Sequence, residues 1–324
     1  MSRKIRWGIL STANIGRERV IPAIQQSRNG EVAAVASRSL DRARAFAAGL
    51  GIPRAYGSYE ELIADPEIDA IYNPLPNSEH APWSIRCAEG GKPVLCEKPL
   101  ASDADETRRM VEAFTSRGLS FAEAFMYRFH PQTVQMKRLV DEGAVGQIKA
   151  ISSAFTFSIR REDDIRLNDA LAGGALMDVG CYCVNVMRLL TGEEPHRAGA
   201  VAQFGASSRV DESLAGVLFF PSGAVGHFDC GFRTFRANFC ELRGTDGRIV
   251  AEPVFNMEPD YAPTLRLWRG ETYETISVPA ANHYTLMAED FAEALLENRP
   301  PRYAPADGIR NMQAIDLLYA AARA

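Results

Sequence analysis

Short apolar runs alternate with amphipathic segments along the first third of the chain. The runs read as strands, and they lie at Ile5–Leu10, Val32–Ser37, Ala70–Asn73, Pro93–Cys96 and Leu119–Ala124. The segments between them repeat apolar residues at helical spacing, beginning with a helix from about Ile15 to Ser27. A chain that alternates in this way folds into a parallel sheet with helices on both faces.

The pattern changes after Phe125. A helix over PQTVQMKRLVDEG precedes the segments KAISSAFTFSI, SLAGVLFFPSGAVGHFDCGF and ANFCELRGTDGRIVAE, which are typical of antiparallel strands joined by Gly and Asp turns. The helix CYCVNVMRLLTG interrupts them, and helices return at Tyr284–Glu297 and Gly308–Ala322. We therefore predict an α/β protein, with a doubly wound parallel sheet domain over residues 1–124 and an α+β domain over residues 125–324.

Composition and charge narrow the class of protein. A chain of 324 residues is long enough for two domains, and its net charge of −5 without a Lys/Arg run argues against a nucleic-acid partner. We see no apolar segment long enough to cross a bilayer, and the apolar run after the charged N-terminus is too short for a signal peptide. We expect a cytoplasmic chain without a membrane partner.

The cysteines and histidines give no metal motif. The 6 cysteines form no C-x-x-C pair, and the spacing of Cys181 and Cys183 is poor for a metal. The 5 histidines are scattered along the chain. We predict reduced, mostly buried thiols and no bound metal.

The stretch GILSTANIG lies where a dinucleotide-binding domain carries its glycine fingerprint, at the first strand-to-helix turn. The three fingerprint positions are Ser11, Ala13 and Gly16. Ser11 and Ala13 are small enough for a tight turn and for the approach of a pyrophosphate, if their φ angles need not be positive, and Gly16 allows close packing of the helix. The amides that follow then point at phosphate. The alternative is a strand, loop and helix without a cofactor.

The end of the second strand bears on the choice of cofactor. An NAD enzyme usually places Asp or Glu there to bind the ribose hydroxyls, whereas this chain has Ser37-Arg38-Ser39. A guanidinium suits a 2′-phosphate, so we predict NADP over NAD, with NAD possible. The alternative is a solvated surface arginine.

Two further loops follow strands of the same sheet, at the edge where ligands bind in open α/β sheets. LCEKPLA carries Glu97 and Lys98, and PLPNSEH carries Asn77 and His80, which could contact the ligand. The alternatives are an exposed lysine and a proline-rich turn. In the second domain, Asp178 and Tyr182 are four apart and so share one face of a helix. Their alternative roles are a helix start and a core residue.

These motifs together resemble the glucose–fructose oxidoreductase and inositol dehydrogenase family. The resemblance rests on GILSTANIG, PLPNSEH, the tripeptide Glu97–Pro99 and GGALMDVGCY, and it covers nearly the full length. It implies a Rossmann domain, a second domain with a large, mostly antiparallel sheet, and a homodimer or homotetramer formed through that sheet. It also implies that Lys98 is catalytic. The family's Asp-x-x-x-His motif falls on Asp178 and Tyr182, and the tyrosine marks the branch that includes NADP-dependent xylose and glucose dehydrogenases and dimeric dihydrodiol dehydrogenase.

The expected site combines the residues of these motifs. Lys98, Tyr182 and Asp178 are the expected catalytic residues. The expected cofactor contacts are Ser11, Thr12, Ala13, Asn14, Ile15, Ser37, Arg38, Leu75, Pro76, Asn77, His80, Glu97, Lys98 and Arg128, the last from the stretch EAFMYRFHP. The expected substrate contacts are Phe155, Arg166, His283 and Tyr284.

A reaction follows from these roles. Tyr182 takes a hydroxyl proton while hydride leaves the same carbon, and Lys98 lowers the pKa of the phenol from its usual value of about 10. The expected activity is an NADP-dependent aldose 1-dehydrogenase acting on a sugar such as xylose or glucose, and the wider substrate class is a sugar or cyclic diol. The alternatives are a trans-dihydrodiol dehydrogenase, a keto-sugar reductase, a redox-neutral glycosidase and a dinucleotide-binding sensor without enzyme activity.

Overall fold

The chain forms two compact units. The computed structural model describes residues 3–324. The first unit contains the residues up to Met126 together with Tyr284–Ile309, and the second contains Tyr127–His283 and Arg310–Ala324. Each unit is described below by itself.

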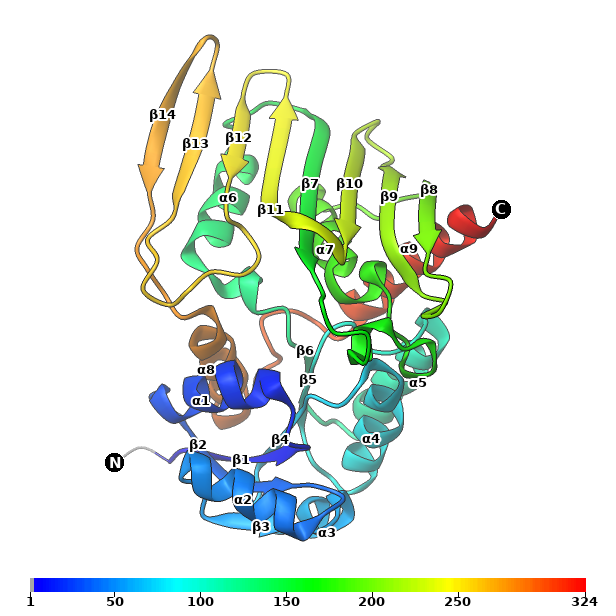
Figure 1. Cartoon of the computed structure of the whole chain (residues 1–324). Helices are drawn as coiled ribbons and strands as arrows, with labels where there is room; N and C mark the ends of the chain where they lie inside the picture. The colour runs from blue at the N-terminus through cyan, green and yellow to red at the C-terminus, as the bar shows by residue number, and fades with distance from the viewer. Residues whose placement is uncertain (1–2) are drawn as a thin grey trace. The chain divides into compact units, whose positions relative to one another are not determined.

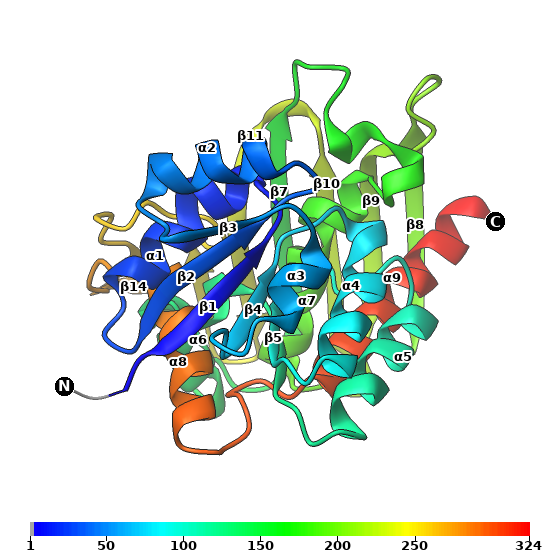
Figure 2. The same ribbon diagram turned by 90° about the horizontal axis from the view of Figure 1, so that it is seen from below.

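The first unit is built on a parallel sheet of six strands in the order β3-β2-β1-β4-β5-β6. The strands are β1 (Ile5–Leu10), β2 (Gly30–Ala36), β3 (Arg54–Tyr56), β4 (Ala70–Asn73), β5 (Val94–Cys96) and β6 (Phe121–Glu123). Figure 2 shows β1, β2 and β3 side by side. The order reverses between β1 and β4, and this switch point is where a doubly wound sheet binds its ligand. The predicted parallel sheet domain is confirmed.

Helices cover the sheet of the first unit. They are α1 (Ile21–Gln26), which follows a π-helical turn over Gly16–Val20, α2 (Leu40–Leu50), α3 (Tyr59–Ala64), α4 (Asn77–Glu89) and α5 (Ala104–Thr115). Side-chain caps begin three of them, because Ser39, Ser58 and Asp103 accept the backbone amides of Arg42, Glu61 and Glu106. Apolar residues of α3, α4 and α5 share one hydrophobic cluster with the strands.

The second unit is built on a sheet of eight strands in the order β14-β13-β12-β11-β7-β10-β9-β8. The strands are β7 (Ile148–Ser158), β8 (Arg197–Phe204), β9 (Asp211–Phe219), β10 (Val225–Gly231), β11 (Arg233–Gly244), β12 (Arg248–Ala251), β13 (Thr264–Arg269) and β14 (Thr272–Ser277). Only β7 and β10 pair in parallel; the other neighbours are antiparallel. The large, mostly antiparallel sheet is therefore confirmed.

Helices cover one face of this second sheet (Figure 1). They are α6 (Pro131–Asp141), α7 (Cys181–Thr191), which continues a π-helical turn over Leu176–Gly180, and α9 (Ala306–Arg323) from Arg310 onward. Asp169–Thr191 is long and apolar enough to cross a membrane by length and composition, contrary to the expectation from sequence. Most of it is buried against the sheet, so we interpret it as a core helix of this unit.

The division between the units differs from the expected one over Tyr284–Ile309, which holds most of α8 (His283–Leu296) and the start of α9. Residues 125–324 were all assigned to the second domain, but α8 belongs to the first unit from Tyr284 onward. The ring of Phe291 packs 5.5 Å from that of Trp7, and the side-chain amide of Asn29 donates to the carbonyl of Glu289 at 2.9 Å. A helical pattern shows which of its faces is apolar, but not which distant sheet that face covers.

Candidate active site

The first turn of the sheet adopts the backbone of a dinucleotide loop without the glycine. Ser11 has a φ of +70°, in the left-handed region that glycine usually occupies, whereas Ala13 is not at positive φ. Of the three fingerprint residues, only Ser11 therefore has a positive φ. Such strain at a non-glycine residue is concentrated at functional sites.

The side chain of Ser11 fits a bound phosphate. Its hydroxyl is shielded from solvent and has no hydrogen-bond partner within the described chain, although a buried hydroxyl normally has one. It lies just before a helix that runs from Asn14, whose first amides are unsatisfied and favour an anion. This orphaned hydroxyl at a helix start is the observation that supports a dinucleotide at the loop.

The other cofactor residues expected in the first unit follow neighbouring strands at the same edge. Ser11–Ile15 follow β1, Ser37 and Arg38 follow β2, Leu75–Asn77 follow β4, and Glu97 and Lys98 follow β5. The parallel sheet therefore brings these motifs together, because the carboxyl ends of parallel strands share one edge.

A second arginine stands beside Arg38. Arg38 and Arg42 are both exposed, and both act electrostatically on Tyr59, where each lowers the pKa of the phenol against the larger effect of burial. Neither guanidinium forms an ion pair within residues 3–324. Sequence reasoning missed Arg42; the signal was its place in the first turn of α2, where Ser39 caps its amide.

Glu97 is buried, and its carboxylate contacts the backbone of the turn that carries Lys98. Tyr72 donates to one of its carboxylate oxygens at 2.7 Å, and the amide of Lys98 donates to the other at 3.3 Å. Burial beside this carboxylate raises the pKa of Tyr72 well above its usual value. The carboxylate is thus engaged with its own domain, and its expected contact with the cofactor stays a prediction.

The ring of His80 is turned into its own domain, and its expected contact with the cofactor stays a prediction. His80 is only 1% exposed, and its Nδ1 and Nε2 lie 2.9 and 2.7 Å from the carbonyl oxygens of Pro99 and Leu75. Both ring nitrogens thus contact backbone carbonyls. Burial outweighs these two contacts and lowers the pKa of His80 to about 4, with Lys98 adding to the shift. His80 therefore links the loop Pro74–His80 to the turn that carries Lys98 and Pro99.

In the second unit, Asp178 and Arg166 form an ion pair. Asp178 lies on the π-helical turn, and the Nε of Arg166 donates to its Oδ2 at 2.8 Å. Asp178 raises the pKa of Arg166, with a smaller contribution from Asp164. The structure thus joins an expected substrate residue to an expected catalytic residue. Their contact with a substrate stays a prediction.

Tyr182 lies in an aromatic cluster. Its ring is 5.4 Å from that of Phe155, 5.5 Å from Phe255 and 5.8 Å from Tyr127. Phe155 was expected beside the substrate, whereas Tyr127 and Phe255 were not singled out. Aromatic rings contributed by four separate segments of the chain share no sequence spacing that could reveal them.

The remaining expected residues divide between the units. Arg128 is 3% exposed and donates from Nε to Asn185 at 2.7 Å in the second unit, and its contact with a cofactor stays a prediction. His283, in the second unit, packs its ring 5.8 Å from that of His130, whereas Tyr284 belongs to the first unit, near Tyr72. Lys98 belongs to the first unit and Tyr182 to the second, so their joint role is a proposal.

Comparison with protein families matches both parts of the chain. Residues 5–125 match the family described as "Oxidoreductase family, NAD-binding Rossmann fold", and residues 133–250 match the "GFO/IDH/MocA C-terminal domain". A D-xylose 1-dehydrogenase (NADP(+)) of Haloferax volcanii is 41% identical over 98% of this chain and 97% of its own length. The chain belongs to the GFO/IDH/MocA oxidoreductase family. The expected family and the expectation of an enzyme are both confirmed.

Other relatives of this oxidoreductase act on different substrates. A trans-1,2-dihydrobenzene-1,2-diol dehydrogenase of Bos taurus is 33% identical over 85% of this chain and 81% of its own. A crystal structure of a 3-ketoreductase from Actinomadura kijaniata in complex with NADP and TDP-benzene superposes with a TM-score of 0.94, at 31% identity over 98% of both chains. This oxidoreductase therefore belongs to a group of NAD(P)-dependent enzymes that includes sugar dehydrogenases and reductases.

Proposed function

We propose that this oxidoreductase is an NADP-dependent aldose 1-dehydrogenase that oxidises a pentose or hexose such as xylose or glucose to its lactone. The observation that carries the proposal is the 41% identity to an NADP-dependent D-xylose 1-dehydrogenase over nearly the whole of both chains. The positive φ and unpartnered hydroxyl of Ser11 support a dinucleotide at the loop. The exposed guanidiniums of Arg38 and Arg42, which form no ion pair within residues 3–324, support NADP over NAD.

The residues of the first unit bind the cofactor in this proposal. Ser11 and the amides of the helix that begins at Asn14 hold the pyrophosphate. Arg38 and Arg42 hold the 2′-phosphate that distinguishes NADP from NAD, since guanidinium groups bind phosphate by charge-assisted hydrogen bonds. Leu75, Pro76 and Asn77 line the same edge of the sheet.

The proton is handled by Tyr182. Bound NADP would supply the acceptor for the hydride that leaves the oxidised carbon. Tyr182 takes the proton from the hydroxyl on that carbon, and in the reverse direction it returns the proton. The ammonium of Lys98 stabilises the phenolate and so lowers the pKa of Tyr182 toward neutrality. Asp178 orients Lys98 or the substrate.

A second candidate is reduction of a keto sugar or oxidation of a trans-dihydrodiol. The 33% identity to a trans-1,2-dihydrobenzene-1,2-diol dehydrogenase and the structural similarity to a 3-ketoreductase favour it. The same residues would serve either reaction, because each moves one hydride and one proton between a carbon–oxygen group and the site.

Absorbance at 340 nm distinguishes these functions. The purified protein is offered NADP or NAD with aldoses, cyclitols and a trans-dihydrodiol, and NADPH with keto sugars. We expect NADP-dependent oxidation of D-xylose or D-glucose as the fastest reaction. Turnover confined to the dihydrodiol or to a keto sugar would replace the first candidate with the second, and no turnover with bound dinucleotide would favour a sensor.

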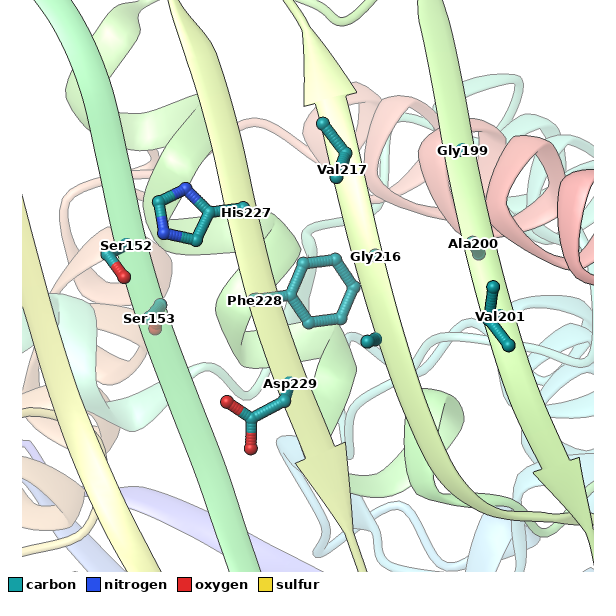
Figure 3. A pocket seen from close by; sticks show the side chains of 11 residues that line it. Ser152, Ser153, Gly199, Ala200, Val201, Gly216, Val217, His227, Phe228 and Asp229 are labelled. Carbon is teal, nitrogen blue, oxygen red and sulfur yellow. The ribbon is translucent and has the colours of Figure 1, made fainter.

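We further propose a cytoplasmic homodimer or homotetramer formed through the open face of the second sheet. That face carries a shallow hollow between β7, β10, β9 and β8 (Figure 3), with Val201 77% exposed. The hollow places Val201 and Val217 beside the polar side chains of Ser152, His227 and Asp229, and a mixed surface of this kind suits contact with a second copy of the chain. No disulfide joins the cysteines within residues 3–324, which suits a reducing compartment. Sedimentation of the parent protein and of Val201→Glu tests the interface.

A further inference from the structure

A buried carboxylate in the second unit has no part in the chemistry proposed above. Asp211 begins β9 and is 1% exposed. A buried carboxylate is costly unless it is well hydrogen-bonded, so its retention in a core calls for a role. The contacts of its two oxygens indicate that role.

One oxygen caps the helix that carries Asp178 and Tyr182. The amide of Leu176, at the start of the π-helical turn, donates to Oδ2 of Asp211 at 2.7 Å. The first amides of a helix have no partner within the helix, and a nearby residue normally caps them. Here the acceptor comes from a strand 35 residues further along the chain, and its negative charge also suits the positive end of the helix.

The other oxygen is fixed by the C-terminal helix. The hydroxyl of Tyr319, on α9, donates to Oδ1 of Asp211 at 2.8 Å. Tyr319 therefore sets the rotation of the carboxylate and keeps Oδ2 directed at Leu176.

The backbone before the helix is shaped to this carboxylate. Gly174 has a φ of +124°, and a Cβ at this position would lie 2.2 Å from Oδ1 of Asp211 and 2.9 Å from the hydroxyl of Tyr319. Only glycine fits such a φ and such an approach. The carbonyl of Gly174 in turn accepts the amide of Asp178 at 3.0 Å. Asp211 thus accepts the amide of Leu176 and lies against Gly174. Because the carbonyl of Gly174 accepts the amide of Asp178, the carboxylate is linked to the backbone of Asp178.

We propose that Asp211, held by Tyr319, is a positioning residue that sets the first turn of the helix carrying Asp178 and Tyr182. The proposal rests on the catalytic roles proposed for those two residues. Asp211 touches neither substrate nor cofactor in this account. Its effect passes through the amide of Leu176 and the backbone of Gly174 to the helix.

The test compares Asp211→Ala with Asp211→Asn. The asparagine oxygen can still accept the Leu176 amide while its NH₂ group donates to the Tyr319 hydroxyl, whereas alanine removes both bonds. We expect faster hydrogen exchange at the Leu176 and Asp178 amides and a kcat lowered by about 10-fold to 100-fold in Asp211→Ala, a common effect of small misplacements. Asp211→Asn should stay near the parent in both, and NADP affinity should not change. Asp260→Asn, on an exposed loop, is the control.

Three outcomes would overturn the proposal. Unchanged exchange at Leu176 in folded Asp211→Ala would show that the carboxylate does not hold the turn. Faster exchange with an unchanged kcat would show that the turn does not position the reacting groups. A positioning role further requires that Asp211→Ala costs nothing more in a Tyr182→Phe background, since the two changes would act on one group. Full activity of Tyr182→Phe itself would overturn the proposed chemistry, and the exchange result would still decide whether Asp211 holds the helix.

Discussion

The Nε of Arg166 donates to Oδ2 of Asp178 at 2.8 Å, and the same guanidinium reaches Asp164. Asp178 lies one turn before Tyr182, on the π-helical turn that continues into α7. The carboxylate is therefore held in place before any substrate arrives. This pairing makes Arg166 a residue that orients Asp178, beside its expected role toward the substrate.

Arg166→Ala should lower kcat/KM for the sugar by about 10-fold to 100-fold, because the partly buried carboxylate of Asp178 loses the charge-assisted partner that fixes its orientation. NADP affinity should stay unchanged. Steady-state kinetics and cofactor titration measure the two effects. Arg160→Ala, an exposed arginine of the same segment, is the control, and equal losses in both variants would contradict the orienting role.

The double variant Arg38→Ala/Arg42→Ala should raise the KM for NADP by at least about 10-fold and leave the KM for NAD nearly unchanged. Hydrogen bonds to a charged group contribute about 1.5–3 kcal/mol each, and 1.4 kcal/mol corresponds to tenfold in affinity. Each single variant should give part of the effect. Arg44→Ala, on the exposed side of the same helix, should change neither value. Parallel increases for both cofactors would contradict binding of the 2′-phosphate.

Ser11 and His80 show what the sequence could and could not predict at this edge. Small residues at the fingerprint positions predicted a tight turn, but the sequence does not reveal which of them takes a positive φ; Ser11 does so at +70°. His80 was predicted as a ligand contact from its place in a loop. Whether a loop side chain points outward or back into its domain depends on carbonyls supplied by residues far apart in the chain, here those of Leu75 and Pro99.

The alternation of apolar runs and helices predicted the first sheet, and the strand-rich segments after Phe125 predicted the second, because burial on one or two faces imposes its period on the sequence. It did not assign α8 to the first unit or reveal Asp211. Both depend on contacts between residues far apart in sequence, such as Trp7 with Phe291 and Leu176 with Asp211. A lone aspartate at a strand start looks like a turn residue until its partners are known.

His80→Ala should loosen the turn that carries Lys98. We expect a lower kcat and a free energy of unfolding lower by about 1–3 kcal/mol, the cost of leaving buried groups unpaired. Chemical denaturation and kinetics at neutral pH measure both, with His196→Ala on the surface as the control. An active and fully stable His80→Ala protein would contradict the role of His80 in holding the two loops together.

His80 and Asp211 should make the free energy of unfolding depend on pH in opposite directions. Burial lowers the pKa of His80 from 6.5 to about 4, so its contribution to stability is present above pH 6.5 and is lost as the pH falls toward 4. Burial raises the pKa of Asp211 from 3.8 to about 6, against hydrogen bonds from Leu176 and Tyr319 and the charge of Arg323. Its contribution is present below pH 3.8 and is lost as the pH rises through 6.

Asp211→Asn should therefore gain stability relative to the parent as the pH rises from 4 to 7, by up to about 3 kcal/mol, since one pKa unit corresponds to 1.36 kcal/mol. Denaturant titrations of both proteins at several pH values across that window measure the difference. Tyr319, Arg323 and Cys230 face this carboxylate and are unchanged in the variant. A difference that is constant with pH would show that Asp211 does not titrate in this window.

The central claim is that Tyr182 transfers the proton in an NADP-dependent oxidation. Its most direct test is kcat of Tyr182→Phe with the best aldose, measured beside the dissociation constant for NADP. The account predicts a loss in kcat of about 100-fold or more, the scale of general acid–base catalysis, with NADP binding unchanged. Turnover near that of the parent protein would contradict it.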